Sequence, residues 1–369
     1  IKNTGTITIG NNSQGLYLKN GDTIDNGGSI LSLGISTVGI FADNVTNPVI
    51  NTGIIDLSGD KSVGIYKTGA VNSISNNNII KIGDSSDLND PGIGIYSNTA
   101  GDIITNSGTI DTGKNSIGIY AEGAAVNQNN ILSVGATGTG IYTKGGTVTL
   151  GAGSNITVGS NESVGVYGTN GTHITNNSTN AVNINNGGYG FILETGSLLD
   201  NHGILSLNGK GTGVYSDGLN TVNNYTGADI NMSGDNNIGI YMVSGGIVNN
   251  DADINGAAGK SNIGIYNKNG TINNTGTINV GNSVLVYKSD GTVEYDKSGY
   301  AVGIYGDGSY INNTGNITVG ENGIGLYTRN NPAAVVNKGN ITGTGKGAVG
   351  LFVDNGVVEN NLGTTITMT

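Results

Sequence analysis

Ser62-Val63-Gly64-Ile65-Tyr66 contains a pattern that returns along the whole chain: a small residue, an aliphatic residue, glycine, a second aliphatic residue and tyrosine. The same five positions recur at Ser116–Tyr120 and at Asn262–Tyr266. The last position of the pattern falls at Tyr17, Phe41, Tyr66, Tyr96, Tyr120, Tyr142, Tyr167, Ile192, Tyr215, Tyr241, Tyr266, Tyr287, Tyr305, Tyr327 and Phe352. From the first to the last there are 14 steps over 335 residues, so the period is about 24 residues. A period of this length is typical of a solenoid, in which each repeat packs on its neighbours.

Each repeat contains three segments with the composition of β-strands. One is the tyrosine segment itself, the second resembles Gly270–Asn274, and the third resembles Thr275–Gly281. All three alternate with a period of two and are rich in β-branched residues, and Gly and Asn separate them. The sequence therefore predicts an all-β chain that forms a right-handed three-faced parallel β-helix (solenoid) of about 15 coils, the hand following the general preference of parallel crossovers. Because the repeat runs from residue 1 to residue 369 without a cap at either end, we expect a single β-helix segment of a longer protein.

Strict alternation along the tyrosine segment predicts which side chains face the interior. Val63 and Ile65 share one side of the strand, so we expect both to be buried, and Ile240 with them. Ser62, Gly64 and Tyr66 would then lie outside, with the ring covering the glycine. The opposite assignment would bury the rings and expose the β-branched residues.

Asparagine also recurs at a fixed phase, just before the third segment of the repeat. The positions are Asn51, Asn106, Asn201, Asn274, Asn313 and Asn337. Side-chain amides that stack at the same phase can donate and accept hydrogen bonds along the stacking direction. We therefore expect these residues to form a structural ladder.

Composition excludes several classes of function. The net charge is −11, the isoelectric point is about 4.4 and Arg329 is the only arginine, so the chain lacks the basic face that nucleic acids or anionic membranes require. Cysteine is absent, which excludes disulfides and thiolate metal sites. No apolar run approaches the roughly 18 residues of a membrane span, so we expect no membrane insertion by this segment.

The small-aliphatic-Gly-Ile-Tyr motif is followed in the repeat by Thr-Ile-x-Asn-x-Gly-x-Ile, and the chain lacks cysteine and is rich in Gly, Asn and Thr. In these features the chain resembles the passenger segments of large fusobacterial type V autotransporter adhesins of the RadD and galactose-inhibitable type. The resemblance covers essentially the whole chain and rests on the structural repeat. It implies a passenger exposed outside the outer membrane, on the bacterial cell surface. It also implies attachment to host cells or to partner bacteria through a glycan or protein receptor. No binding motif of the family maps onto numbered residues of this chain.

Two departures from the period are candidate functional segments, because insertions in solenoids lie in loops and loops carry function. The first, at 82–92, contains Asp84, Asp87 and Asp90, which are weak candidates for binding calcium because the spacing of a calcium-binding loop is absent. A solvated loop is the simpler interpretation of these three aspartates.

The second departure, at 287–301, begins a stretch in which tyrosines crowd together. Tyr287, Tyr295, Tyr300, Tyr305 and Tyr310 lie within 24 residues, mixed with acidic residues and lysines. A tyrosine ring with its polar tip suits both sugar stacking and protein contacts, so these five residues are the candidate ligand-binding site. The alternative is a charged hairpin-like excursion whose rings pack back on the solenoid.

We expect no catalytic residues and no cofactor. The carboxylates are scattered, and His173 and His202 fall at different phases of different repeats, whereas glycoside cleavage needs two carboxyl groups close together. The predicted function is a non-enzymatic adhesin stalk, acting as a monomer. A polysaccharide-active β-helix enzyme and a phage-tailspike-like fibre remain as alternatives, whereas the threonines are too irregular for an ice-binding face.

Overall fold

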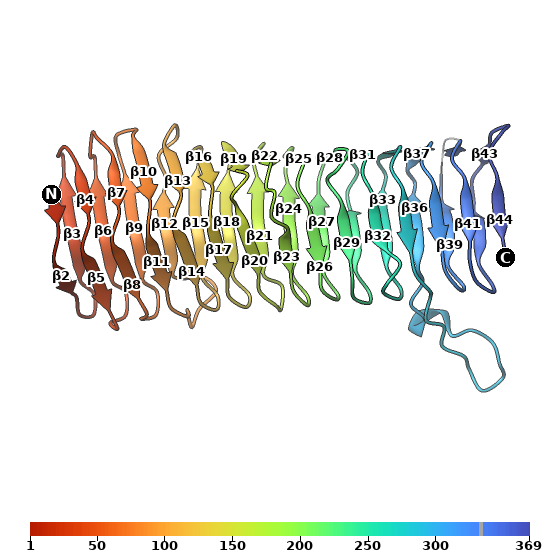
Figure 1. Cartoon of the computed structure of the whole chain (residues 1–369), viewed down its shortest axis with the longest axis horizontal. Coiled ribbons are helices and arrows are strands. Elements are labelled where there is room, and N and C mark those ends of the chain that lie inside the picture. The colour runs from red at the N-terminus through yellow and green to blue at the C-terminus, as the bar shows by residue number, and fades with distance from the viewer. Residues whose placement is uncertain (332–334) are drawn as a thin grey trace. The chain divides into compact units, whose positions relative to one another are not determined.

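The computed structural model describes residues 1–331 and 335–369, except for the side chain of Tyr295. Within that part the chain is all β, apart from the three-residue 3-10 helix η1 (Tyr295–Lys297). Two compact units are present, Ile1–Val182 and Asn183–Thr369, here called the first and the second unit. In each unit the strands follow one another as in a parallel solenoid (Figure 1). The described residues of both units make about 15 turns.

Three parallel sheets, A, B and C, build the first unit. Sheet A contains β1 (Lys2–Asn3), β4 (Ile24–Asn26), β7 (Val49–Asn51), β10 (Ser73–Asn76), β13 (Ile103–Asn106), β16 (Ala125–Gln128), β19 (Thr147–Leu150) and β22 (His173–Asn176). Sheet B contains β2 (Thr6–Thr8), β5 (Ser29–Ser32), β8 (Ile54–Leu57), β11 (Ile79–Ile82), β14 (Thr109–Thr112), β17 (Ile131–Val134) and β20 (Asn155–Val158). Sheet C contains β3 (Gln14–Lys19), β6 (Val38–Asp43), β9 (Val63–Thr68), β12 (Ile93–Ser97), β15 (Ile117–Glu122), β18 (Thr139–Lys144) and β21 (Val164–Thr169).

The second unit repeats this arrangement, and β23 (Val182–Ile184) lies where the two units meet in the sequence. Sheet A contains β25 (Leu198–Asn201), β28 (Thr221–Asn224), β31 (Ile247–Asn250), β34 (Thr271–Asn274), β37 (Tyr310–Asn313), β40 (Val335–Asn337) and β43 (Val358–Asn360). Sheet B contains β26 (Leu205–Leu207), β29 (Ile230–Met232), β32 (Ile254–Gly256), β35 (Ile278–Val280), β38 (Ile317–Val319), β41 (Ile341–Gly343) and β44 (Ile366–Met368). Sheet C contains β24 (Tyr189–Glu194), β27 (Thr212–Asp217), β30 (Ile238–Met242), β33 (Ile263–Lys268), β36 (Val302–Asp307), β39 (Ile324–Arg329) and β42 (Val349–Asp354).

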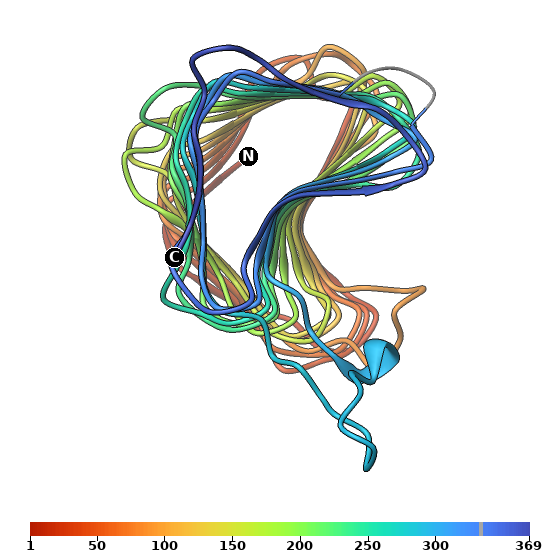
Figure 2. The ribbon, with the colours of Figure 1, turned by 90° about the vertical axis from the view of Figure 1, so that its right-hand side faces the viewer.

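The parallel β-solenoid with three sheets confirms the fold predicted from the repeat. Equivalent residues pair from turn to turn, so that Tyr96 is the register partner of Tyr66 on one side and of Tyr120 on the other. Figure 2 shows that a turn has three sides and that one of them bends inward. Within each unit this register places the motif copies of successive turns in a row along sheet C.

The face assignment of the motif is partly wrong. Ile65 is buried and Tyr66 is half-exposed, as expected, but Val63 is also half-exposed, whereas Ser62 and Gly64 are buried. Alternation therefore breaks once, because Gly64 and Ile65 both face the interior. Ile240 is fully buried, as predicted, and its neighbour Ile238 faces outward.

Glycine makes this break possible. A Cβ on Gly264 would lie 2.5 Å from the carbonyl oxygen of Gly303 in the next turn and 2.6 Å from Cγ2 of Ile278. Contacts that short are forbidden, so only glycine fits where the strand turns its backbone toward the core. The glycine does not lie under the tyrosine ring; it bends sheet C.

A ladder of buried side-chain amides runs inside sheet A, as the asparagine phase predicted. In the second unit Asn250 donates to Asn274 at 2.7 Å, and Asn274 donates to Asn313 at 2.7 Å. In the first unit Gln128 replaces asparagine at one position of the ladder and accepts a hydrogen bond from Asn106 at 2.9 Å. These bonds satisfy polar groups that would otherwise be buried without partners.

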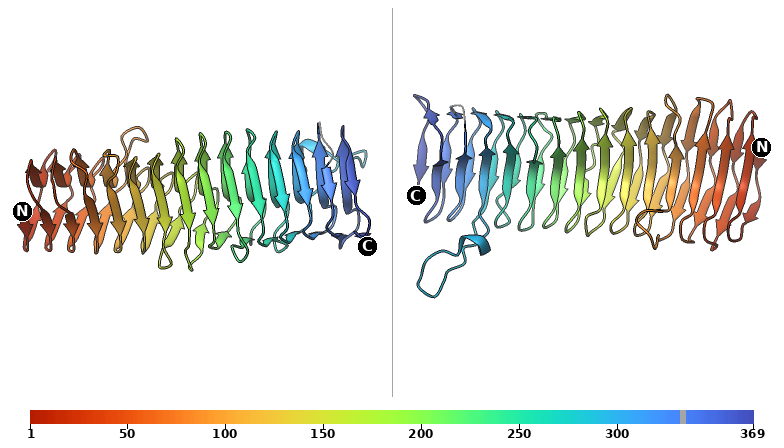
Figure 3. Two further views of the ribbon diagram at one scale, coloured as in Figure 1. Left: turned by 90° about the horizontal axis from the view of Figure 1, so that it is seen from above. Right: turned by 180° about the vertical axis from the view of Figure 1, so that it is seen from behind.

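One position in the predicted period is wrong. Tyr266 pairs with Tyr305 in sheet C, so Tyr287 belongs to no turn and lies in the long connection from β35 to β36. The step from Tyr266 to Tyr305 covers 39 residues and is the longest between described motif positions. Figure 3 shows that this connection projects away from the neighbouring strands.

Candidate functional site

Aromatic rings on the outer side of sheet C stack from turn to turn. In the first unit the ring centroids of Tyr66 and Tyr96 are 4.6 Å apart and the planes differ by 9°. Tyr120 continues the stack at 5.0 Å and 11°, and Tyr142 follows at 5.1 Å and 12°. Because each ring lies against the next, the faces of the rings inside the stack are covered. The row contributes stabilising aromatic contacts in addition to any exposed surface.

The aromatic row of the second unit is less regular. Tyr305 and Tyr327 stack with centroids 4.4 Å apart, whereas Tyr266 and Phe352 contact this pair edge-on, at 86° and 87°. Burial raises the pKa of Tyr305 to about 12, and the neighbouring Tyr327 adds to the shift. Burial also raises the pKa of Tyr266. These phenols therefore stay neutral at physiological pH.

A second row, made of aliphatic side chains, runs beside the aromatic one. It exists because the break at glycine turns the first aliphatic residue of many motif copies outward, as Val63 shows in the first unit. Val164 and Val302 hold the same position but are buried. In the second unit the two rows border a groove of about 330 Å³. Its lining residues are Ile263, Tyr300, Val302, Tyr305, Ile324, Tyr327 and Phe352, and we call it the sheet C groove.

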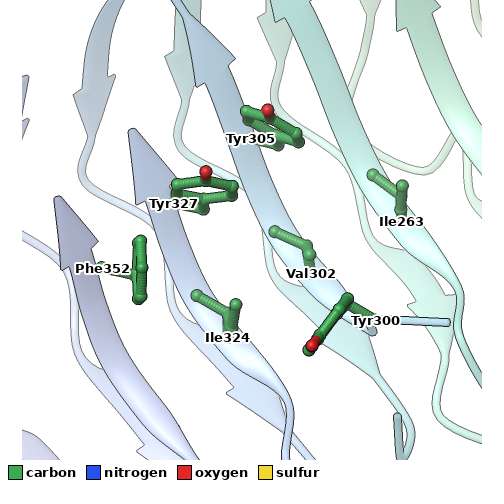
Figure 4. A pocket seen from close by; sticks show the side chains of 7 residues that line it. All are labelled: Ile263, Tyr300, Val302, Tyr305, Ile324, Tyr327 and Phe352. Carbon is green, nitrogen blue, oxygen red and sulfur yellow. The ribbon is translucent and has the colours of Figure 1, made fainter. Parts of the chain in front are cut away.

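Figure 4 shows how the lining side chains are arranged. Tyr305, Tyr327 and Phe352 form one side of the groove. Ile263, Val302 and Ile324 form the other, and Tyr300 lies beside Val302. The groove is therefore lined by apolar atoms from four consecutive strands of sheet C, β33, β36, β39 and β42, and by one residue of the long connection.

The structure brings together only two of the five candidate tyrosines. Tyr300 and Tyr305 line the sheet C groove. Tyr287 is 58% exposed on the long connection, and Tyr310 begins a strand of sheet A, on a different side of the turn. The side chain of Tyr295 lies outside the described residues. The sequence did not predict Ile324, Tyr327 and Phe352 as site residues. The aliphatic row beside the aromatic one can be recognised only once the break in alternation is known.

The connection between β35 and β36 is hairpin-like, as the alternative interpretation of this segment expects, but Tyr287 is exposed on it and does not pack back on the strands. Antiparallel bridges join Val284 to Gly299 and Tyr287 to Val293. At its base, Ser298 Oγ accepts a hydrogen bond from the backbone of Val286 at 2.9 Å. We call residues 284–299 the hairpin.

Charged side chains lie on both sides of the groove. Beyond the aromatic row, Lys268, Asp307, Arg329 and Asp354 alternate in sign from turn to turn, and Arg329 Nη2 lies 3.4 Å from Asp307 Oδ2. This row of charges is balanced.

The hairpin side also carries charges of both signs. Glu294 pairs with Lys297 at 2.8 Å. Asp290 and Asp296 make no ion pair among the described residues. Lys288 of the hairpin, and Lys260 and Lys346 of the turns beside it, carry the opposite charge. Hydrogen bonds from the side chain and backbone of Thr292 lower the pKa of Asp290, which is therefore ionised. Glu321 joins this side, since its carbonyl oxygen accepts from the backbone of Ser283 at the start of the connection.

The three aspartates of the first departure do not converge. Asp84 Oδ1 accepts from the backbone of Lys114 at 2.7 Å, Asp87 Oδ1 accepts from that of Asn89 at 2.9 Å, and Asp90 pairs with Lys61 at 3.1 Å. Each carboxylate thus has its own partner. Among the described residues, no group of three or more Asp, Glu or His side chains is placed to hold a metal ion.

Carboxylates do meet at one corner of the second unit. Glu194 and Asp217 are register partners and line a hollow of about 680 Å³. The remaining lining residues are Thr195, Gly196, Gly218 and Leu219. None of these side chains is basic, so the hollow offers no cation for an acidic polysaccharide.

Comparison with known proteins gives one partial match. Residues 244–367 match the family model for the third pectate lyase-like domain of BigA. The matched range lies inside the second unit and contains the whole sheet C groove. No curated protein and no solved structure matches the chain. In the described part of the chain, no helix is long and apolar enough to cross a membrane.

Proposed function

We propose that the chain is a non-enzymatic adhesin segment, exposed on a bacterial surface, that attaches to host cells or to other bacteria. The sheet C groove is the observation that carries this proposal. Apolar side chains that line an open groove lose contact with water when a partner covers them, which favours binding. The similarity to a BigA domain and the resemblance to autotransporter passengers support display at the cell surface.

The proposed mechanism needs no cofactor and no reacting group. Tyr327 and Ile324 supply apolar surface from the two sides of the groove, and Tyr300, which follows the hairpin, lies at its edge. The rest of each turn holds these side chains in register through the sheets and the amide ladder. The solenoid would thus act as a rigid support for one adhesive face.

Attachment of coated beads tests the proposal. Beads carrying the full chain are counted on cultured epithelial cells and on a panel of bacteria. We expect Ile324→Ser and Tyr300→Ala each to reduce attachment about tenfold, as for central residues of a binding face. Ile117→Ser, at the equivalent position of the first unit, and Tyr310→Ala, on sheet A, serve as controls and should attach normally.

Circular dichroism checks that all four variants stay folded. Equal attachment by groove variants and controls would exclude the groove as the adhesive face. Release of reducing sugars or unsaturated products from acidic polysaccharides by the unmodified chain would instead favour an enzyme.

A further inference from the structure

Tyrosine is the main oxidisable side chain of the first unit. The sequence contains no cysteine and no tryptophan, and its three methionines, Met232, Met242 and Met368, all belong to the second unit. Sulfur groups are the usual targets of oxidants in proteins, so their absence directs oxidation of residues 1–182 to the phenol rings. All six tyrosines of this unit occupy the aromatic row of sheet C: Tyr17, Tyr66, Tyr96, Tyr120, Tyr142 and Tyr167.

Four of these rings, from Tyr66 to Tyr142, form a regular stack, here called the tyrosine stack. Successive centroids are 4.6, 5.0 and 5.1 Å apart, and the planes differ by at most 12°. This spacing matches the distance of about 4.8 Å between neighbouring strands, so each ring repeats the position of the ring before it. All four rings are half-exposed. An oxidant from the solvent can therefore reach rings that already lie in register.

The first two hydroxyls of the stack lie close to each other. Burial raises the pKa of Tyr96, and a hydrogen bond with the hydroxyl of Tyr66 adds to the shift. Two hydroxyls within hydrogen-bonding reach also bring together the ring carbons next to them. Neighbouring rings of the stack are thus held in an arrangement that favours a bond between these carbons.

Tyr120 has a proton acceptor next to its hydroxyl, which donates a hydrogen bond to Oε1 of Glu122 at 2.7 Å. Burial raises the pKa of Tyr120, and the hydrogen bond to Glu122 raises it further, so the phenol is neutral at physiological pH. A neutral phenol that loses an electron must also lose its proton, and a carboxylate at this distance can accept it. Glu122 therefore favours Tyr120 as the first ring of the stack to be oxidised.

A stacked pair in the second unit lacks such an acceptor. The rings of Tyr305 and Tyr327 are 4.4 Å apart, and their planes differ by 24°. Among the described residues, the Tyr305 hydroxyl makes no hydrogen bond to a carboxylate. Comparison with this pair separates the effect of stacking from the effect of the proton acceptor.

We propose that the tyrosine stack is a site of oxidative cross-linking, at which a one-electron oxidant of the peroxidase type joins Tyr120 to Tyr96 or to Tyr142 as dityrosine. Two neighbouring phenols each give up one electron and one proton, and the two radicals form a carbon–carbon bond between the ring carbons next to their hydroxyls. The hydrogens on these carbons then move to the oxygens and restore both phenols. One hydrogen peroxide takes up the two electrons and two protons and leaves as two water molecules. This modification is independent of the sheet C groove and of the adhesive function.

Cross-linking would tie neighbouring turns together. Tyr96 and Tyr120 are 24 residues apart, and Tyr120 and Tyr142 are 22 apart. A covalent bond across such a segment restricts the unfolded chain more than the folded one, in which the rings are already in contact. The oxidised chain should therefore melt at a higher temperature than the untreated chain.

Peroxidase treatment of the full chain tests this assignment. Dilute protein is treated with a plant peroxidase and hydrogen peroxide, so that links form within one molecule, and dityrosine is measured by its fluorescence. Digestion with trypsin and a glutamate-specific protease, followed by mass spectrometry, identifies the joined peptides. Lys114 lies between Tyr96 and Tyr120, and Glu122 lies between Tyr120 and Tyr142, so each link joins two separate peptides.

Variants of the first unit separate the contributions. Tyr120→Phe keeps a ring in the stack but removes the phenol, so both links to this position should disappear. Glu122→Gln keeps the stack but removes the proton acceptor and should lower these links about tenfold. Tyr17→Phe and Glu162→Gln are the matched controls, since the ring against Tyr17 is Phe41 and Glu162 is exposed in a loop. Neither control should change the yield, and circular dichroism checks that every variant is folded.

We expect the links to Tyr120 to be the most abundant and to exceed a Tyr305–Tyr327 link about tenfold. Three results would overturn the inference: dityrosine that forms only between molecules, links to Tyr120 that are no more abundant than the Tyr305–Tyr327 link, or a yield at Tyr120 that Glu122→Gln leaves unchanged. The first would show that the stack does not couple. The other two would show that the carboxylate does not direct the oxidation.

Discussion

Lys67 Nζ lies 2.7 Å from Oδ2 of Asp102, and both side chains are completely buried in the first unit. Lys67 also donates to the carbonyl oxygen of Ala70 at 2.6 Å. Asp102 accepts further bonds from the backbone of Asn72 at 2.9 Å and from Ser97 Oγ at 2.5 Å. A buried ion pair persists only when its remaining hydrogen-bonding groups are satisfied in this way.

The ion pair gives a clear prediction for stability. Lys67→Met leaves the buried carboxylate of Asp102 without its cation and should cost about 3–5 kcal/mol of unfolding free energy. Adding Asp102→Asn removes that charge and should recover most of the loss. Urea unfolding followed by circular dichroism measures both variants. A loss below about 1 kcal/mol for Lys67→Met alone would show that the pair is not buried as described.

The amide ladder predicts different results for two adjacent residues. Asn274 is buried and exchanges hydrogen bonds with Asn250 and Asn313, so Asn274→Ala leaves several polar groups unpaired and should cost about 2–4 kcal/mol. Asn273 faces outward and donates only to Asn249, so Asn273→Ala should cost less than about 1 kcal/mol. The same urea titration compares them. Similar losses at both positions would contradict the ladder.

The break in alternation is tested by two isoleucines of one strand. Ile240 is fully buried, whereas Ile238 lies in the outward aliphatic row. Ile240→Asn places an amide in the core and should lower the melting temperature strongly, at a cost of about 3–5 kcal/mol. Ile238→Asn should change it little. If both variants melt alike, alternation is regular and the described bend is wrong.

Alkaline pH should destabilise the second unit through its aromatic row. The pKa of Tyr305 is about 12 in the folded chain, whereas an unfolded tyrosine titrates near pH 10. Between these values the unfolded state loses a proton that the folded state keeps, so stability present below about pH 10 is lost as the pH rises toward about 12. Melting temperatures measured across this range should fall. Tyr305→Phe should lessen the fall, whereas Tyr287→Phe, at an exposed position, should not.

The sequence predicted those parts of the fold that depend on periodicity. A recurring Gly-Ile-Tyr defines sheet C, and a recurring Asn defines the ladder, because the same physical requirement returns in each turn. Tyr287 lies at about the spacing that the repeat predicts, but the residues before it do not match the motif fully. Val286 occupies the position of the second aliphatic residue, whereas Leu285 occupies the position where the motif has glycine. That missing glycine was the signal that no turn of sheet C forms there.

The candidate site was harder to predict because it depends on a local exception. Ile324 resembles a core residue by composition, yet it lies on the outer side of its strand, before the glycine. Val302 lines the same groove although it is buried. Lys67 and Asp102 are 35 residues apart, so their pairing depends on the register across an enlarged turn. Neither feature has a periodic signature.

The amide ladder also has a consequence for how such a chain changes in length. Asn224, Asn250 and Asn274 each present the same donor and the same acceptor to their neighbours. If residues 250–273 were deleted, Asn224 would meet Asn274 with the geometry it now shares with Asn250, and Tyr241 would meet Tyr305 where it now meets Tyr266. Whole turns can therefore be gained or lost during evolution without leaving a mismatched junction. In this deletion Ile238 would take the place beside Val302 that Ile263 now holds.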